Sequence, residues 1–161
     1  MKPFKYQLEF TVRDYECDLQ GIVNNAVYQN YLEHTRHEFI KTLGIDFAEM
    51  HTKGIDLVVA RLEMAFKTPL KSGDTFISYL NVQQKGIKII FEQEIYRQPD
   101  KTCALKAMVT AVSLVNGKLK IVPEIEEAVD RVTDLPADLR RRPHIMAVKS
   151  AEIPILKIAI A

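Results

Sequence analysis

The chain of 161 residues contains little cysteine, no tryptophan and almost no surplus of charge. Its two cysteines, Cys17 and Cys103, form neither a metal-spaced pair nor the framework of a secreted disulfide protein, so we expect free thiols in a reducing, cytoplasmic compartment. The 22 basic and 21 acidic residues leave a net charge of +1, too little for the basic stripe that nucleic-acid binding needs. Nucleic acid is therefore not an expected partner.

Long hydrophobic runs are also missing. The first residues contain no apolar signal core, and no run approaches the ~20 residues that a membrane-spanning helix needs. The apolar run at 153–160 is short and carries Pro154 and Lys157, so we expect it to pack on protein rather than to enter a membrane. A chain of this length favours a single domain that buries roughly 70% of its unfolded surface.

The pattern of apolar residues changes from a period of two to a helical period near Asn25. Apolar residues alternate with polar ones over residues 4–12, which predicts a half-buried strand. After Asn25 the spacing becomes three and four, which predicts a helix of about 19 residues, capped at its end by Gly44. The apolar stripe of this helix consists of Tyr28, Tyr31, Leu32, Thr35, Phe39, Ile40 and Leu43.

Strand patterns separated by turn residues follow the helix. They are predicted over residues 57–66, 75–82, 87–96 and 103–115, and the pair Asn116-Gly117 predicts a tight hairpin into 118–122. Residues 124–132 could form a short helix. We therefore expect an α+β fold in which a mostly antiparallel β-sheet wraps one long central helix. Residues 1–142 would form this domain, and 143–161 a C-terminal extension of unknown role.

The loop between the first strand and the helix holds the strongest candidate for chemistry, Asp18. Loops held between rigid elements often carry functional residues. With an ordinary pKa of about 3.9, an aspartate is ionised at neutral pH and can act as a base or nucleophile. The first N–H groups of the following helix lack internal partners and can bind an anion. The alternative is structural, because an Asp in a loop commonly stabilises a turn or caps a helix.

Several further motifs accompany this loop. They are Asp18-Leu19-Gln20-Gly21-Ile22-Val23 leading to Tyr28, then Arg36, the turn Pro69-Leu70-Lys71-Ser72-Gly73-Asp74, the strand motif Phe91-Glu92-Gln93, and Ile121-Val122-Pro123. In these motifs and their order, the chain resembles the hotdog-fold acyl-CoA thioesterases of the 4-hydroxybenzoyl-CoA thioesterase family. It departs from the family pattern at Val27, which stands where an Asn is usual.

The resemblance implies an acyl-CoA thioesterase that hydrolyses a thioester to a free acid and CoA, without a cofactor. Asp18 would be the nucleophile or the general base, and the backbone N–H of Asn25 would polarise the thioester carbonyl. Gly21 would let the backbone turn closely beneath the thioester. The resemblance also implies a homodimer or homotetramer with sites where subunits meet.

Four further residues are predicted to bind substrate. Tyr28 is one of five candidates for the acyl pocket, and which of them point inward stays open: Tyr28, Tyr31, Phe39, Val58 and Met64. By the resemblance, Glu33 contacts the distal ring group of an aroyl substrate. Glu33 is also the backup base if Asp18 fails, or else part of a solvated helix face. Lys85 and Lys88 would meet the CoA phosphates.

The sequence offers two other candidate reactive groups besides Asp18, and two functions other than thioester hydrolysis. His34 and His37 lie three residues apart without a further ligand, so no metal site is expected, and Cys17 has no paired His to activate it. A non-catalytic acyl-CoA or acyl-carrier binding module is the alternative function. A hydratase or dehydratase would need a His on the loop or helix start, and no His lies between Met1 and Glu33. The acyl group, and the choice between CoA and carrier-protein thioesters, stay open.

Overall fold

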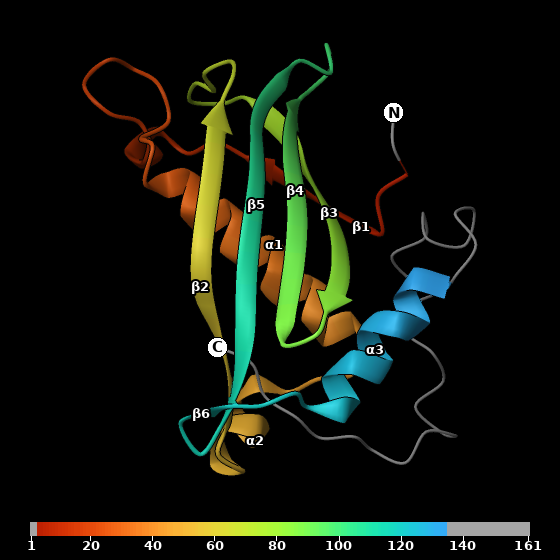
Figure 1. Ribbon diagram of the computed structural model, residues 1–161. Helices are drawn as coiled ribbons and strands as arrows, with labels where there is room; N and C mark the ends of the chain where they lie inside the picture. Colours follow the sequence, from red (N-terminus) through yellow and green to blue (C-terminus); the bar gives the residue numbers. More distant parts are fainter. Residues whose placement is uncertain (1–2, 135–161) are drawn as a thin grey trace.

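The computed structural model describes residues 3–134, in which one long helix lies across the concave face of a curved sheet (Figure 1). The strands are β1 (Tyr6–Thr11), β2 (Ile55–Phe66), β3 (Thr75–Lys85), β4 (Lys88–Arg97), β5 (Cys103–Val115) and β6 (Lys118–Leu119). The helices are α1 (Val27–Thr42), α2 (Phe47–Thr52) and α3 (Pro123–Asp134), with a single 3-10 turn, η1 (Asp14–Glu16).

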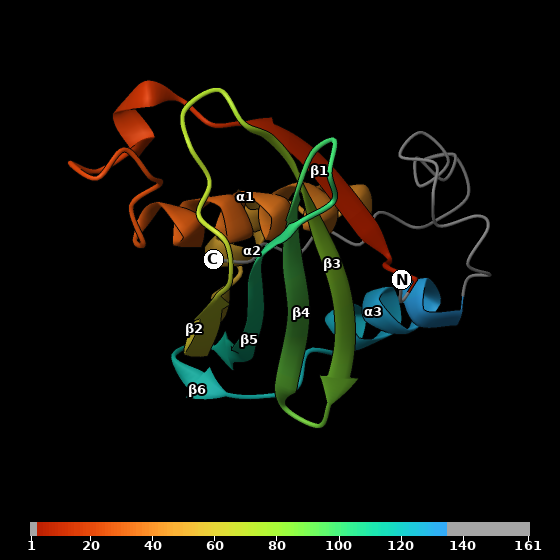
Figure 2. The same cartoon turned by 90° about the horizontal axis from the view of Figure 1, so that it is seen from above.

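The sheet has the order β1-β3-β4-β5-β2, with β6 paired to β5, and every pairing between described strands is antiparallel. The strands are long and apolar on the face toward α1, and the natural twist of such strands curls the sheet around the helix. Figure 2 shows β1 leaning over α1 from one side. Asn116 and Gly117 both have positive φ, 50° and 75°, as a type I′ hairpin requires. The predicted hotdog fold is confirmed.

Helix α1 covers 16 residues rather than the predicted 19 or so. It begins at Val27, after a turn that Asn24 stabilises: the Asn24 side chain accepts from the N–H of Ala26 at 2.9 Å and its carbonyl accepts from the N–H of Val27 at 2.9 Å, while the N-cap residue, Ala26, has no side-chain cap. Gly44, with φ 75°, donates its N–H to the carbonyl of Lys41, so the predicted end is confirmed. Six of the seven predicted stripe residues are buried: Tyr28, Tyr31, Leu32, Thr35, Phe39 and Ile40.

Three details differ from the sequence prediction. Helix α2 was not predicted, because six residues are too few for a helical period; it is capped by Asp46, whose side chain accepts from the N–H of Glu49. Strand β6 has two residues rather than the predicted 118–122, since the chain leaves the sheet to begin α3. Helix α3 begins at Pro123, a residue suited to a first helical turn, and exceeds the predicted 124–132 at both ends.

The core has two parts, one toward each end of α1. Phe39 lies in the part that α3 covers, together with β3, β4 and β5. The other part surrounds Tyr28, Tyr31 and Phe76 and lies beneath the loop that carries Asp18. Within residues 3–134 no helix combines the length and apolar character needed to cross a membrane. The predicted extension at 143–161 lies outside the described residues.

Candidate active site

The Asp18 loop folds into a small hairpin. Cys17 and Val23 form an antiparallel bridge, the N–H of Asp18 donates to the carbonyl of Ile22 at 2.9 Å, and the N–H of Gly21 donates to the carbonyl of Asp18 at 3.0 Å. Gly21 has φ 74°, a conformation that favours glycine. The hairpin therefore fixes Asp18 in a loop that leads directly into the start of α1.

The carboxylate of Asp18 combines a structural contact with a free oxygen. Its Oδ1 accepts the N–H of Gln20 at 2.8 Å, which is the turn-stabilising contact expected of a loop aspartate. In the described part of the chain the other oxygen, Oδ2, accepts no hydrogen bond. This side chain is thus fixed by one oxygen and available through the other.

A second loop holds the Asp18 loop in place. Val12 exchanges backbone hydrogen bonds with the turn at Gly73 and Asp74, and the N–H of Val23 donates to the carbonyl of Leu70 at 2.9 Å. The N–H of Leu70 in turn donates to the hydroxyl of Tyr28 at 3.3 Å. Tyr28 was predicted to bind substrate, but in this chain it is buried and supports the two loops from below.

The backbone at the start of α1 leaves one donor exposed. The N–H of Asn24 donates to the carbonyl of Glu16 at 3.0 Å, and those of Ala26 and Val27 are capped by Asn24. The N–H of Asn25 has no acceptor among residues 3–134, and Asn25 is exposed. A free N–H at the positive end of a helix suits a developing oxyanion.

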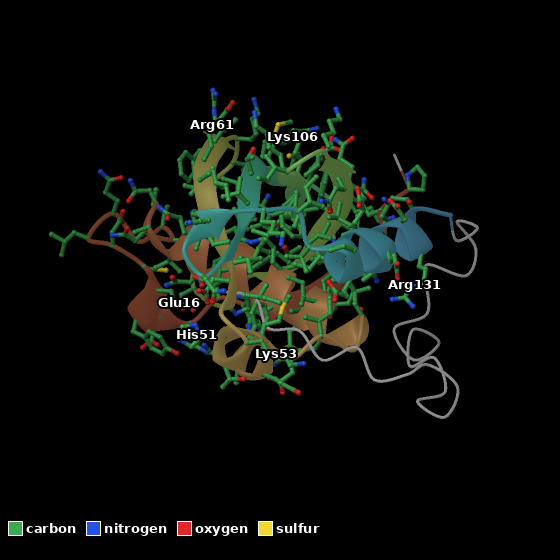
Figure 3. The ribbon with its side chains drawn as sticks, turned by 60° about the horizontal axis from the view of Figure 1, so that its bottom comes forward. Glu16, His51, Lys53, Arg61, Lys106 and Arg131 are labelled. Carbon is green, nitrogen blue, oxygen red and sulfur yellow. The ribbon has the colours of Figure 1, made fainter. Side chains whose placement is uncertain are left out.

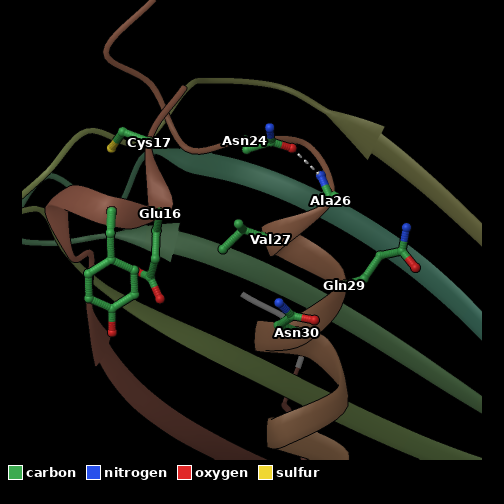
Figure 4. A pocket seen from close by; sticks show the side chains of 8 residues that line it. Glu16, Cys17, Asn24, Ala26, Val27, Gln29 and Asn30 are labelled. Atoms are coloured by element: carbon green, nitrogen blue, oxygen red, sulfur yellow. Dashed lines mark hydrogen bonds between the residues drawn. The ribbon is translucent and has the colours of Figure 1, made fainter. Parts of the chain in front are cut away.

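Sequence reasoning missed Glu16, whose side chain lies on the helix side of the sheet, opposite the face from which Arg61 and Lys106 project (Figure 3). Glu16 borders an open pocket of about 530 Å³ at the start of α1 (Figure 4). The pocket is lined by Tyr15, Glu16, Cys17, Asn24, Ala26, Val27, Gln29 and Asn30. The signal that could have found Glu16 is an acidic residue two positions before Asp18, on the same short loop.

The carboxylate of Glu16 is fully engaged. Its Oε2 accepts the hydroxyl of Tyr31 at 2.6 Å and the N–H of Arg13 at 2.8 Å, and the Arg13 guanidinium lies 3.8 Å from Oε1. Burial, together with the neighbouring Glu16 carboxylate, raises the pKa of Tyr31 far above its ordinary value of about 10. The pair ties the loop before Asp18 to the second turn of α1.

The hydrogen bond between Tyr31 and Glu16 should make the stability of the fold depend on pH in the alkaline range. Since folding raises the pKa of Tyr31, its contribution to stability is complete below about pH 10 and is lost as the pH rises toward the folded-state pKa. We expect Tyr31→Phe to lower the free energy of unfolding by about 1–3 kcal/mol at neutral pH, because a hydrogen bond to a charged group is lost. Urea unfolding of both proteins at neutral pH and above about pH 10 would measure this difference in the free energy of unfolding, which should shrink as the pH rises. A difference that grows with pH would contradict a raised pKa of Tyr31 in the folded protein.

Glu33 lies in a second hollow, of about 350 Å³, between α1 and β2. Its half-exposed carboxylate is 3.7 Å from Nε2 of His37, whose pKa is lowered by burial and raised in part by Glu33. Gln29 lines both this hollow and the pocket at the helix start. Glu33 thus lines a cavity that shares Gln29 with the pocket at the start of α1, and it lies farther along the helix than Asn25.

Lys85 and Lys88 lie at the other end of the strands. They face each other across the β3–β4 turn, whereas the loop carrying Asp18 follows β1, whose last residue pairs with Thr75 at the start of β3. Ten residues of strand separate Thr75 from Lys85, about 33 Å at 3.3 Å per residue. The structure therefore does not bring these two lysines to the Asp18 loop of their own chain.

The remaining polar candidates show structural contacts. The rings of His34 and His37 pack against Phe10 and Phe47. Among residues 3–134, no three His, Cys, Asp or Glu side chains are grouped to hold a metal ion. Cys17 and Cys103 are free thiols, as predicted.

Comparisons with known proteins agree with this fold. Residues 12–143 match the Thioesterase-like superfamily. The chloroplastic acyl-acyl carrier protein thioesterase ATL3 of Arabidopsis thaliana is 40% identical over 112 residues, which make up 69% of this chain and 59% of the relative. The chain thus spans about three fifths of the length of that plant protein.

Two solved structures support the same fold. A Thermus thermophilus thioesterase complexed with coenzyme A and Zn is 25% identical, with a TM-score of 0.71 over 84% of this chain and 100% of that chain. A 1,4-dihydroxy-2-naphthoyl-CoA thioesterase from Synechocystis, 15% identical, has a TM-score of 0.76 over 81% of this chain and 98% of that one, and shows the fold alone. The curled sheet and its central helix agree with the match of residues 12–143 to this family. The chain therefore belongs to the thioesterase-like superfamily of hotdog-fold proteins.

Proposed function

We propose that this protein is an acyl thioesterase that hydrolyses an acyl-CoA or acyl-carrier-protein thioester to a free acid and a thiol. The observation that carries the proposal is the free N–H of Asn25 at the start of α1, beside the Asp18 hairpin, in a member of the thioesterase-like superfamily. The names of the relatives support both thiol carriers: the Arabidopsis protein acts on acyl carrier protein thioesters, and the Thermus structure holds coenzyme A.

The reaction needs an oxyanion donor and a base or nucleophile. The thioester carbonyl oxygen would accept the N–H of Asn25, which stabilises the negative charge that develops on this oxygen. The free oxygen of Asp18 would either take a proton from the attacking water or attack the carbonyl carbon itself, to be released by water. In both cases the carbon–sulfur bond breaks, the acyl group gains a hydroxyl from water, and the thiolate leaves with a proton.

Asp18 is a better base than either neighbouring glutamate. Glu16 accepts hydrogen bonds from Tyr31 and Arg13 through Oε2, and its Oε1 lies 3.8 Å from the Arg13 guanidinium, so this carboxylate is held by a structural network and an ion pair. Glu33 lies six residues beyond Val27, about 9 Å along the helix axis, and is paired with His37. Asp18 is the one of these three carboxylates that is positioned by its loop, has an oxygen without a hydrogen bond and has no ion-pair partner among the described residues.

We also propose that the protein works as a homodimer or homotetramer. Strand β2 is an edge of the sheet, and its half-exposed Val59 borders the hollow beside α1. A neighbouring copy could cover this edge. Lys85 and Lys88 are too far from their own Asp18 loop to serve it, so a role in binding CoA would require them to act on the site of another copy.

Release of free thiol from a panel of acyl-CoA and acyl-carrier-protein thioesters tests the function. We expect hydrolysis of at least one member of the panel, with the free acid and the thiol formed in equal amounts. Tight binding of acyl-CoA without thiol release would instead support the non-catalytic binding module. Neither binding nor release from any thioester would contradict both.

A further inference from the structure

Arg36 is a charged side chain to which the proposed mechanism gives no role. Its Nη1 donates to Oε1 of Gln93 at 3.0 Å, and its guanidinium carbon lies 6.0 Å from the centre of the Phe91 ring. Gln93 is fully buried and donates its Nε2 to the carbonyl of Leu32 at 3.0 Å. The guanidinium is thus held in one orientation by a side chain that cannot move freely.

Most of the hydrogen-bonding capacity of Arg36 is unused. A guanidinium carries five N–H donors, and within residues 3–134 only the one to Gln93 meets an acceptor. Burial lowers the pKa of Arg36 to about 10, while the carboxylate of Glu33 acts in the opposite direction. A partly buried charge with so few partners is unfavourable unless something else accepts its protons.

The free donors border the hollow between α1 and β2. Its walls are mainly apolar, from Leu57, Val58 and Leu62 of β2 and Val109 of β5, and it measures about 350 Å³. Gln29 lines both this hollow and the pocket at the start of α1. Arg36 lies nine residues after Val27, about 14 Å along the helix axis. An acyl chain whose thioester sits at Asn25 could follow this face of the helix to Arg36.

The carboxylate of Glu33, which lines the hollow with Arg36, restricts which chemical group of a ligand can bind Arg36. Glu33 lines the same hollow, yet the two form no ion pair in the described part of the chain. A hydrocarbon end would leave the donors of Arg36 without acceptors, and a carboxylate that pairs with Arg36 would also be repelled by Glu33. A hydroxyl or oxo oxygen carries no net charge and accepts from Arg36, and a hydroxyl can also donate to Glu33.

We propose that this hollow receives the acyl group and that Arg36 donates a hydrogen bond to a hydroxyl or oxo oxygen far from the thioester. The preferred substrates are therefore thioesters of acyl groups that carry a distal hydroxyl or oxo oxygen, rather than plain hydrocarbon chains of the same length. This proposal rests on the proposed thioesterase function and adds the substrate class.

Matched substrates test the proposal on the unaltered protein. The ratio of kcat/KM for ω-hydroxydodecanoyl-CoA to that for dodecanoyl-CoA should be about ten- to hundredfold, as one hydrogen bond to a charged group predicts. ω-Carboxydodecanoyl-CoA should be poorer than the ω-hydroxy substrate, because Glu33 repels its carboxylate. A ratio near one, with thiol released from both, overturns the role of Arg36 and leaves the thioesterase function intact. No thiol release from any of them, or from the wider panel, overturns both proposals.

Variants then assign the preference to Arg36. Arg36→Met keeps the length of the side chain but removes its donors, so the ratio should fall to about one; Arg36→Lys should restore part of it. Arg61→Met is the matched control, because Arg61 lies on β2 with a 72% exposed side chain paired to Glu63, and it should keep the wild-type ratio. A changed sedimentation coefficient for Arg36→Met alone would show that Arg36 serves a contact between subunits and would overturn the proposal.

Discussion

Replacing Asp18 with Asn is expected to lower kcat by about 10³-fold, since the loss of a general base typically reduces the rate by 10²- to 10⁴-fold. The amide keeps the shape of the side chain and its acceptor oxygen, so the contact with the N–H of Gln20 can persist. What it removes is the negative charge on the free oxygen. Thiol release under saturating acyl-CoA would measure the loss.

Asp14→Asn is the matched control for this experiment. Asp14 is an exposed aspartate of η1, four residues before Asp18, and its carbonyl rather than its carboxylate supports the loop. We expect it to keep nearly full activity, and both variants to melt within a few degrees of the wild type. Activity retained in Asp18→Asn but lost in Glu33→Gln would identify Glu33, on α1, as the catalytic base instead of Asp18.

Replacing Asn25 with Pro is expected to lower kcat by about 10²–10³-fold, the usual effect of losing one oxyanion donor. Proline has no backbone N–H, so it removes the proposed donor directly. The N–H of Asn25 makes no hydrogen bond within residues 3–134, and its removal therefore breaks no contact that the described fold uses. The measurement is again thiol release at saturating substrate.

Asn25→Ala separates the main chain from the side chain. Alanine keeps the N–H, and the exposed Asn25 side chain accepts or donates no hydrogen bond among the described residues. We expect its kcat to stay within about twofold of the wild type. An alanine variant as slow as the proline variant would show that the side chain, not the N–H, takes part. Melting curves of both variants would identify any loss caused by unfolding.

Local patterns predicted the fold well because they depend on neighbours in the sequence. The stripe from Tyr28 to Ile40 and the positive φ of Asn116 and Gly117 follow from helix spacing and turn chemistry. Helix α2 was missed, since six residues show no period. The start of α1 was placed two residues early, because the sequence shows that Asn24 can cap a helix but not which N–H groups it will cap.

The site was predictable only where its residues are near in the sequence. Asp18 and Gly21 share one short hairpin that leads into Asn25, and their joint role in catalysis stays a prediction. The bond from Arg36 to Gln93 joins residues 57 positions apart and depends on how β4 lies beneath the helix, which no local pattern specifies. The same limit explains Lys85 and Lys88, whose distance from the Asp18 loop follows from the length and pairing of β3.

The pocket at the start of α1 and the hollow between α1 and β2 share a single lining residue, Gln29, in the described part of the chain. The first is built from the loop and the helix start, whereas the second is built from the flank of α1 and the edge of the sheet. Substitutions in β2 can therefore reshape the second cavity without disturbing the first. Such a modular arrangement would let evolution, or an engineer, change the acyl preference of this scaffold while its hydrolytic centre stays constant.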